Sequence, residues 1–416
     1  MSDKCCQGYS SYCIEPRDAL PGQHIILIDM NQNVVHEWSL IGQGAMLPDG
    51  SILGNRNSGE DEESTQEAIT AEFIQEGWDG QEEWSFRNWD DAGTGVMMSR
   101  QHHDYQKEGN PVGYYAPGQE ANPHGKTLIL SHKNKVVPEI RGDKELLDDV
   151  IYEVDWQGNL TGFEWHAADH YDEMGFDESA REDLYQLGHR ESTDRVRDVR
   201  DWLHINSTAV LGKNQWYDET HDERFNPANI IIGSRSANFV AIFSRKTGNI
   251  VWRVGPDFTK DTAEQNFGQL IGQHHAHMIP KGLPGGGNIL IFDNGGQSGY
   301  GGSTGYPRYT RDYSRVIEFN PVTLEPIWQY GTETGKERFH SNFISSAQRL
   351  PNGNTLITEG ANGRIFEVTR DREIVWEFIS PTRGKKNNAV YRAYRVPPEW
   401  VPGNPAGYKE WATLYE

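Results

Sequence analysis

The sequence predicts an all-β protein, a single β-propeller of six or seven four-stranded blades. Two observations support this prediction. A hairpin made of an apolar strand, a turn and a tryptophan-bearing strand recurs along the chain, and a second hairpin with a Pro/Gly/Asn turn recurs between its copies. Apolar and polar residues alternate within both, which is typical of antiparallel sheet.

The first hairpin has six copies, each with one tryptophan anchor. They are found at 25–38 (Trp38), 72–84 (Trp84), 150–165 (Trp165), 239–254 (Trp252), 315–330 (Trp328) and 364–378 (Trp376). The second hairpin is found at 46–53, 278–292 and 349–357. Because equivalent strands of successive blades surround one axis, we expect functional side chains where the innermost strands face the central channel.

The remaining segments are assigned from their composition. We expect a lead-in over 1–22, the propeller as a catalytic domain over 23–400 and a tail over 401–416, with the strand-like run 389–396 joining the N-terminal region in one blade. The segment 166–200 predicts a short helical insertion near 170–200, which we expect to cap one mouth of the channel. We interpret the acidic run 58–83 as a solvated edge and the glycine-rich run 294–307 as a rim loop.

The composition limits the classes of partner. The 416 residues carry a formal charge of -22, with 39 Lys and Arg against 61 Asp and Glu, which argues against nucleic acid and anionic membranes as partners. No window is apolar enough to span a membrane, and the N-terminus lacks a signal-peptide pattern. We therefore expect a soluble monomer, cytoplasmic unless a leader was removed, with secretion left open. The three cysteines, Cys5, Cys6 and Cys13, precede the first strand and form no disulfide framework, although a bridge to Cys13 stays open.

Histidines cluster at the starts of the predicted inner strands. They are His102, His103, His204, His274, His275, His277 and His340. Alternate residues of a strand share a face, so Trp202, His204 and Asn206 are expected to form one set, and His275 and His277 another. Recurrence of one residue type at matching repeat positions favours a histidine-lined functional channel.

Arginines and tyrosines accompany the histidines. Arg100, Arg235, Arg315 and Arg392 offer planar charged groups suited to a carboxylate or a sulfate, whereas Arg253 is expected to be a surface ion-pair partner. Tyr391 and Tyr394 follow in the last strand-like run.

These groups support two chemistries. Arginine can neutralise a uronate carboxylate while histidine or tyrosine moves the protons of a β-elimination. Alternatively, a histidine can attack a sulfuryl group, with the other cationic side chains stabilising its oxygens. Metal binding by His275 and His277 is a weaker alternative.

Four blocks of sequence resemble the arylsulfotransferase-like β-propeller family. They are DWLHINS (201–207), IGQHHAHMIPKGLPGGGNILIFDNG (271–295), YSRVIEF (313–319) and SSAQRLPNGNTLITEG (345–360). The resemblance covers roughly residues 23–400 and implies that His204, His274 and Arg315 occupy the sulfotransferase centre, with His340 as a candidate for its covalent histidine. In its compact length, the chain also resembles the L-rhamnose-α-1,4-D-glucuronate lyases, which act on acidic plant polysaccharides such as gum arabic.

Our preferred hypothesis from the sequence is a polysaccharide lyase that cleaves a terminal uronate glycoside. The alternatives are an aryl-sulfate sulfotransferase with a histidine nucleophile and a non-catalytic binding scaffold. The predicted catalytic residues are His102, His103, His204, His275 and Arg315; the predicted substrate-binding residues are Arg100, Arg235, Asn206, His274, His277, His340, Tyr391 and Arg392. The expected partner is an acidic oligo- or polysaccharide, or an aryl sulfate. No cofactor is expected to be required, and a metal ion in the channel is the less favoured option.

Overall fold

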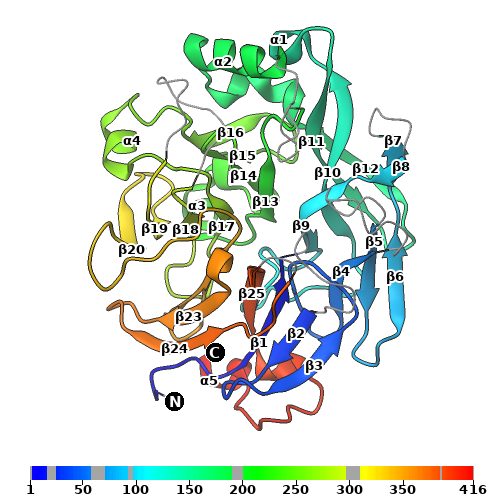
Figure 1. Ribbon diagram of the computed structural model, residues 1–416, viewed down its shortest axis with the longest axis vertical. Helices are drawn as coiled ribbons and strands as arrows, with labels where there is room; N and C mark the ends of the chain where they lie inside the picture. The colour runs from blue at the N-terminus through cyan, green and yellow to red at the C-terminus, as the bar shows by residue number, and fades with distance from the viewer. Residues whose placement is uncertain are drawn as a thin grey trace.

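The structure is a computed structural model that describes residues 2–15, 25–57, 71–91, 97–189, 200–296, 310–384 and 387–415. It shows six blades arranged around a central axis (Figure 1). The predicted propeller is therefore confirmed, and the number of blades is six rather than seven. Residues 58–70 of the acidic run 58–83 and residues 297–307 of the glycine-rich run 294–307 lie outside the described residues.

Blade 1 closes the ring by joining the two ends of the chain. From the axis outwards it consists of β25 (Val390–Val396), β1 (Tyr9–Ile14), β2 (Ile25–Ile28) and β3 (Val34–Trp38). The last strand pairs antiparallel with the first, for example Ser11 with Tyr394, so neither is left as an open sheet edge. This pairing confirms the predicted closure, and the N-terminal segment supplies its second strand.

Blades 2 to 6 follow in chain order. Blade 2 contains β4 (Ile52–Asn57), β5 (Ala71–Glu76) and β6 (Glu82–Phe86), and its axial position is completed by the bridges Ile41 to Asn55 and Met46 to Ile52. Blade 3 runs outwards from β9 (Gln101–Lys107) through β10 (Thr127–Val136) and β11 (Glu145–Val154) to β12 (Leu160–His166).

Blade 4 consists of β13 (Ile205–Val210), β14 (Ile230–Ser234), β15 (Phe239–Phe243) and β16 (Ile250–Val254). Blade 5 consists of β17 (His274–Met278), β18 (Ile289–Asp293), β19 (Arg315–Phe319) and β20 (Pro326–Tyr330), and blade 6 of β21 (Ser346–Arg349), β22 (Thr355–Glu359), β23 (Arg364–Val368) and β24 (Ile374–Ile379).

Short elements occupy the connections. They are the ribbon β7 (Trp89–Asp91) and β8 (Met97–Ser99), the helices α1 (Pro138–Arg141), α2 (Glu178–His189), α3 (Gln215–Thr220), α4 (Thr262–Phe267) and α5 (Trp411–Tyr415), and the 3-10 turns η2 (Ala167–Met174), η3 (Glu223–Phe225), η4 (Gly360–Asn362) and η5 (Pro398–Trp400). No helix of the described residues is long and apolar enough to cross a membrane. Cys5, Cys6 and Cys13 are buried free thiols, so the bridge that the sequence left open is not formed.

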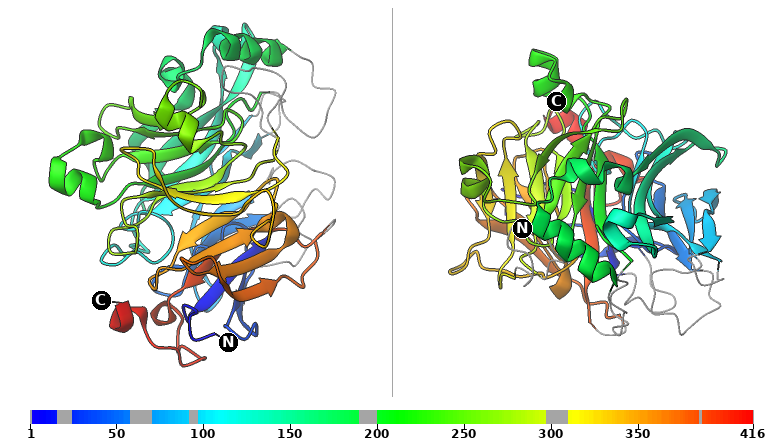
Figure 2. Two further views of the ribbon diagram at one scale, coloured as in Figure 1. Left: turned by 90° about the vertical axis from the view of Figure 1, so that its left-hand side faces the viewer. Right: turned by 90° about the horizontal axis from the view of Figure 1, so that it is seen from above.

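The predicted helical insertion is present, but it does not cap the channel. Its described part, η2 and α2, packs against β11, β16 and α1 at the outer edge of the ring, far from the axis (Figures 1 and 2). Apolar side chains of this insertion, such as Tyr171 and Leu184, are buried against the outside of blades 3 and 4. The described part of the insertion therefore does not form the expected cap, because it buries its apolar face between two blades. Residues 190–199 lie outside the described part of the chain.

The six tryptophan anchors link each blade to the next. Each one reaches the turn between the two outer strands of the following blade. Four indole Nε1–H groups donate to a backbone carbonyl there: Trp165 to Gly248 (2.9 Å), Trp252 to Pro321 (2.8 Å), Trp328 to Arg370 (3.0 Å) and Trp376 to Met30 (3.1 Å). Trp38 and Trp84 instead pack on the turn tryptophans Trp78 and Trp156, with ring centroids 5.6 and 6.2 Å apart. The repeat seen in the sequence is thus the contact that holds neighbouring blades together.

We predict that Trp376→Phe destabilises the protein by about 1 kcal/mol more than Trp38→Phe, because only the first substitution leaves a buried carbonyl without its donor. Trp38 is the matched control, since its Nε1 has no hydrogen-bond partner among the described residues. Urea denaturation of the two variants gives the comparison. Equal losses would show that the indole hydrogen bonds add nothing to blade packing.

Candidate active site

The candidate site lies on one face of the propeller. In every blade the innermost strand begins on this face, and the connections from outer strands to the next inner strand cross it. The turn between β14 and β15, which carries Arg235, reaches the same face. The topology therefore brings the predicted histidines and arginines of blades 3 to 6 to one mouth of the channel.

Three histidines at this mouth share an unusual backbone conformation. His103, His204 and His275 have φ values of 51°, 50° and 53°, in the left-handed region that non-glycine residues seldom adopt. Each lies at a register shift near the start of an inner strand, in β9, before β13 and in β17. The strain costs about 1 kcal/mol or more per residue. Its repetition in three successive blades points to a functional constraint on where these side chains lie.

Below the histidines, a buried carboxylate joins the inner strands. Asp104 accepts hydrogen bonds from the side chain of Gln43 and from the backbone N–H of Thr208 (3.0 Å), and its Oδ1 lies 3.3 Å from Nη1 of Arg392. Arg392 is 2% exposed, and although burial opposes its charge, Asp104 raises the pKa of the guanidinium. The channel beside this pair leaves a cavity of about 10 Å³, room for about one water molecule. This cavity is too small for anything larger than a water molecule.

At the mouth, His204 forms a carboxylate–imidazole pair with Asp201. Its Nδ1–H donates to Oδ2 of Asp201 in a short hydrogen bond, and its ring meets that of His103 edge-on with centroids 4.6 Å apart. The other ring nitrogen, Nε2, has no hydrogen-bond partner among the described residues, and 19% of the His204 side chain is exposed. This arrangement fixes the tautomer that leaves an accessible lone pair.

A second carboxylate–imidazole cluster adjoins the first. Nε2 of His102 lies 3.3 Å from Oδ1 of Asp149, and its Nδ1 lies 2.9 Å from Nδ1 of His103. The ring of His132 stacks on that of His102 with centroids 3.7 Å apart, and its Nε2 lies 3.5 Å from the same oxygen of Asp149. The predicted residues His102, His103 and His204 are thus brought together.

Both carboxylates of these clusters are charged despite their burial. Burial alone would raise the pKa of Asp201, but the imidazoles of His204 and His132 hold it well below its usual range. Burial opposes the charge of Asp149 in the same way, and the adjacent imidazoles of His102 and His132 lower its pKa. The mouth therefore contains two anionic carboxylates within a group of imidazoles.

The other predicted histidines form part of the packed walls. Nδ1 of His274 lies 2.7 Å from Oδ1 of Asn294, and Nδ1–H of His275 donates to the carbonyl of Ala347 at 3.0 Å. Both ring nitrogens of His277 are engaged, by the carbonyl of His275 (2.9 Å) and the hydroxyl of Tyr114 (2.8 Å). His275 and His277 do share a face, with ring centroids 4.5 Å apart, but their hydrogen bonds hold blades together.

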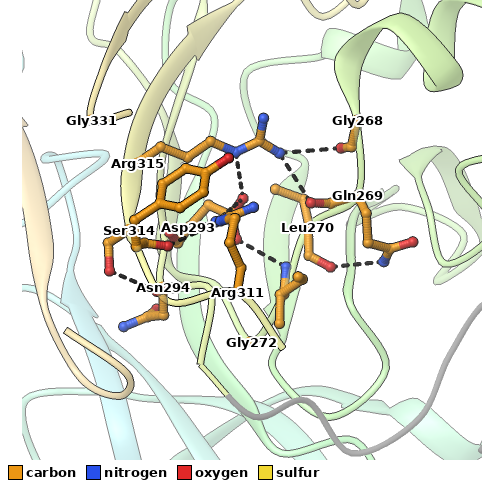
Figure 3. Close-up of polar contacts among 12 residues, drawn as sticks. Gly268, Gln269, Leu270, Gly272, Asp293, Asn294, Arg311, Ser314, Arg315 and Gly331 are labelled. Carbon is orange, nitrogen blue, oxygen red and sulfur yellow. Dashed lines mark hydrogen bonds and ion pairs between the residues drawn. The ribbon is translucent and has the colours of Figure 1, made fainter. Parts of the chain in front are cut away.

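Arg315 is held by the protein itself (Figure 3). Its Nε donates to Oδ2 of Asp293 at 2.7 Å, and its Nη2 donates to the carbonyls of Gly268 (3.3 Å) and Gln269 (3.0 Å). Arg311 approaches the same carboxylate oxygen of Asp293 at 3.0 Å. This network ties blade 5 to the connection that precedes it.

The remaining predicted residues have mixed environments. Arg100 donates to the carbonyl of His132 (3.2 Å) and to Asn134 (2.7 Å), and the amide of Asn206 donates to the carbonyl of Gln273 (2.8 Å). The hydroxyl of Tyr391 donates to the carbonyl of His103 at 3.1 Å. The side chains of Arg235 and His340 are partly exposed at this face. The backbone N–H of Arg235 donates to the carbonyl of His204 at 3.2 Å.

The expectation that Trp202 shares a face with His204 and Asn206 is wrong. Trp202 does not lie with His204 at the mouth but is buried in the core beside Tyr171, with ring centroids 6.0 Å apart. The alternation of a strand does not apply, because β13 begins only at Ile205 and His204 is left-handed.

Three residues of the site were missed by reasoning from the sequence. Asp201 lies inside the block DWLHINS, and Asp149 follows Asp148 in the middle of the buried strand β11. Acidic residues within a buried strand were the available signal, since carboxylates are rarely buried without a partner. His132 had no comparable signal.

Comparison with a family model decides the classification. The model described as Arylsulfotransferase (ASST) matches residues 118–392, which include Asp201 and His204 but not His102 or His103. The chain belongs to this family. The resemblance noted in the four sequence blocks is thereby confirmed.

Two curated relatives carry the name arylsulfate sulfotransferase AssT. The chain is 26% identical to that of Escherichia coli over 227 residues, which are 47% of this chain and 32% of the relative. It is 25% identical to that of Lelliottia amnigena over 223 residues, with 47% and 32% covered. The chain thus matches about a third of the length of these relatives.

Two solved structures resemble this chain weakly. A protein of unknown function from Bacteroides caccae covers 94% of this chain, with 99% of its own length covered, at 10% identity and a TM-score of 0.42. A virginiamycin B lyase from Staphylococcus aureus covers 91% of this chain, with 86% of its own length, at 10% identity and a TM-score of 0.37. These likenesses say nothing about the reaction.

The buried histidines predict a loss of stability in acid. Burial lowers the pKa of His277 to about 4 and those of His274 and His275 well below the ordinary value. The unfolded chain binds protons on these groups below a pH of about 6.5, so their contribution is complete above that pH and is lost as the pH falls. For His277 the contribution is about 3 kcal/mol.

Urea denaturation between pH 7 and pH 4 is the measurement. The slope of the free energy of unfolding against pH reports how many protons unfolding takes up. We expect His277→Gln to reduce that number by up to one, whereas His221→Gln, at an exposed histidine, leaves the slope unchanged. A His277→Gln variant with the wild-type slope would contradict the assignment of a buried neutral imidazole.

Proposed function

We propose that this protein is an aryl-sulfate sulfotransferase in which His204 is the nucleophile. The observation that carries the proposal is the Asp201–His204 pair at the mouth of the channel. Its geometry leaves Nε2 of His204 as an accessible lone pair, which is what attack on a sulfuryl group requires. Membership of the arylsulfotransferase family supports the same chemistry.

The reaction follows a double displacement. Nε2 of His204 attacks the sulfur of the donor, the S–N bond forms as the bond from sulfur to the aryl oxygen breaks, and the aryloxide takes a proton from the neighbouring imidazole of His103. An acceptor phenol then returns a proton to His103, and its oxygen attacks the sulfur as the S–N bond breaks. Asp201 stabilises the cationic imidazole that forms at His204. Arg235, partly exposed beside His204, would bind the sulfuryl oxygens.

The lyase that the sequence favoured has less support. In a lyase, Arg235 and Arg315 would bind the carboxylate of the uronate. A histidine or a tyrosine would transfer the protons. Arg315 is committed to Asp293 and two carbonyls, and the Tyr391 hydroxyl donates to a backbone carbonyl. Uronate elimination is therefore kept as the competing outcome of the test below.

The test is transfer of the sulfuryl group from 4-nitrophenyl sulfate to phenol, followed by the absorbance of nitrophenolate. We expect His204→Gln to lower kcat by about 10³-fold or more and Asp201→Asn by about 10²–10⁴-fold, because the latter variant no longer fixes the tautomer. His340→Gln is the matched control, since His340 is the other candidate nucleophile. Mass spectrometry of acid-quenched protein should find one sulfuryl group on the peptide that contains His204.

Three results would overturn the proposal. They are absence of transfer in the wild type, a sulfuryl group on the peptide of His340 with activity retained in His204→Gln, and formation of an unsaturated uronate from gum arabic by a protein that transfers no sulfate. The last outcome would establish the lyase instead.

A further inference from the structure

Three ligand-type atoms meet beside the mouth, in blade 3. They are Nε2 of His102, Nε2 of His132 and Oδ1 of Asp149, and all lie within 4.8 Å of one another. Their residues come from the adjacent strands β9, β10 and β11, and His132 is the direct cross-strand partner of Asp149. Three neighbouring strands of a sheet form a rigid frame for such a group.

The spacing of these atoms matches ligands around a common centre. The oxygen of Asp149 lies 3.3 Å from the nitrogen of His102 and 3.5 Å from that of His132. Charge-assisted hydrogen bonds are shorter, about 2.7–2.9 Å. Two ligands bound tetrahedrally to zinc at about 2.0–2.1 Å are about 3.3–3.4 Å apart.

Two buried carboxylate oxygens at the same place support this view. Oδ1 of Asp149 and Oδ1 of Asp201 make no hydrogen bond of ordinary geometry with the described residues. The Asp201 oxygen lies 3.8 Å from Nε2 of His132, on the side of the cluster that faces His204. A buried carboxylate oxygen without a donor is costly, and a cation removes that cost.

The contacts around the cluster are those that a metal site requires. Nδ1 of His102 faces Nδ1 of His103 at 2.9 Å, and Oδ2 of Asp149 accepts the N–H of Ile205 at 3.3 Å. Outer partners of this kind orient ligating imidazoles and carboxylates. The side chains are nearly closed off from solvent, with 5% of His102, 11% of His132 and none of Asp149 exposed.

We propose that His102, His132 and Asp149 bind one divalent transition-metal ion of the zinc class. Two imidazoles and a carboxylate are the ligands such ions take, whereas Mg²⁺ and Ca²⁺ prefer oxygen alone. Asp201 lies between this cluster and His204, because its Oδ1 is 3.8 Å from Nε2 of His132 and its Oδ2 accepts from His204. The site is separate from the proposed nucleophile, and metal binding is measurable whether or not the protein transfers sulfate.

The test is titration of the full-length protein, dialysed against EDTA, with ZnCl₂ in a calorimeter. We expect one equivalent per chain, a raised unfolding temperature, and at least about 100-fold weaker binding in His132→Gln and in Asp149→Asn. With Co²⁺ as the probe, the visible absorption of a bound ion should appear in the wild type and disappear in both variants. His166→Gln is the matched control, because His166 of β12 pairs with Asp148 of β11 in the same sheet but outside the cluster, and it should bind as the wild type does.

Circular dichroism of the metal-free variants checks that they fold, and either folded variant suffices for the comparison. Absence of saturable Zn²⁺ binding in the wild type would overturn the proposal. The cluster of His102, His132 and Asp149 would then be a group of imidazoles around a buried carboxylate and not a metal site. Wild-type affinity in the cluster variants, or loss of binding in His166→Gln, would overturn it as well by placing the ion elsewhere.

Discussion

The mouth of this propeller depends on one buried carboxylate. Asp104 contacts the side chain of Gln43 in blade 2, the backbone of Thr208 in blade 4 and the guanidinium of Arg392 in blade 1. Four of the six inner segments are therefore held around a single charge. A charge buried near an axis is tolerated only when several donors converge on it, so this node fixes how closely the inner strands approach.

The site above that node combines strain with charge. The left-handed conformations of His103, His204 and His275 are maintained because neighbouring blades hold each inner strand in place. Asp149 and Asp201 remain anionic in the same region because imidazoles surround them. The fold thus supplies a rigid set of nitrogen bases at the mouth, which suits group transfer at an anionic substrate better than it suits a scaffold that binds passively.

Family and site geometry support the two enzymatic hypotheses unequally. Both included His204 and Arg315, and the lyase also needed a histidine or tyrosine to move the protons of a uronate. The ion pair of Arg315 with Asp293 and the hydrogen bond of Tyr391 to a backbone carbonyl leave the lyase with less support, whereas the proposed transfer by His204 uses neither group. What remains, an imidazole oriented by a carboxylate, is the minimum for a covalent sulfuryl intermediate.

The sequence by itself determined the propeller, its repeat and the identity of the tryptophan anchors, because strand alternation and turn residues are local properties of the chain. It also located His102, His103 and His204 at the starts of inner strands. Only the tertiary structure decided that Asp149, Asp201 and His132 join them, that His275 and His277 belong to the packed wall, and that Arg315 is already paired. These outcomes depend on which side chains of distant strands meet across a sheet or an axis, and no local pattern encodes that distance.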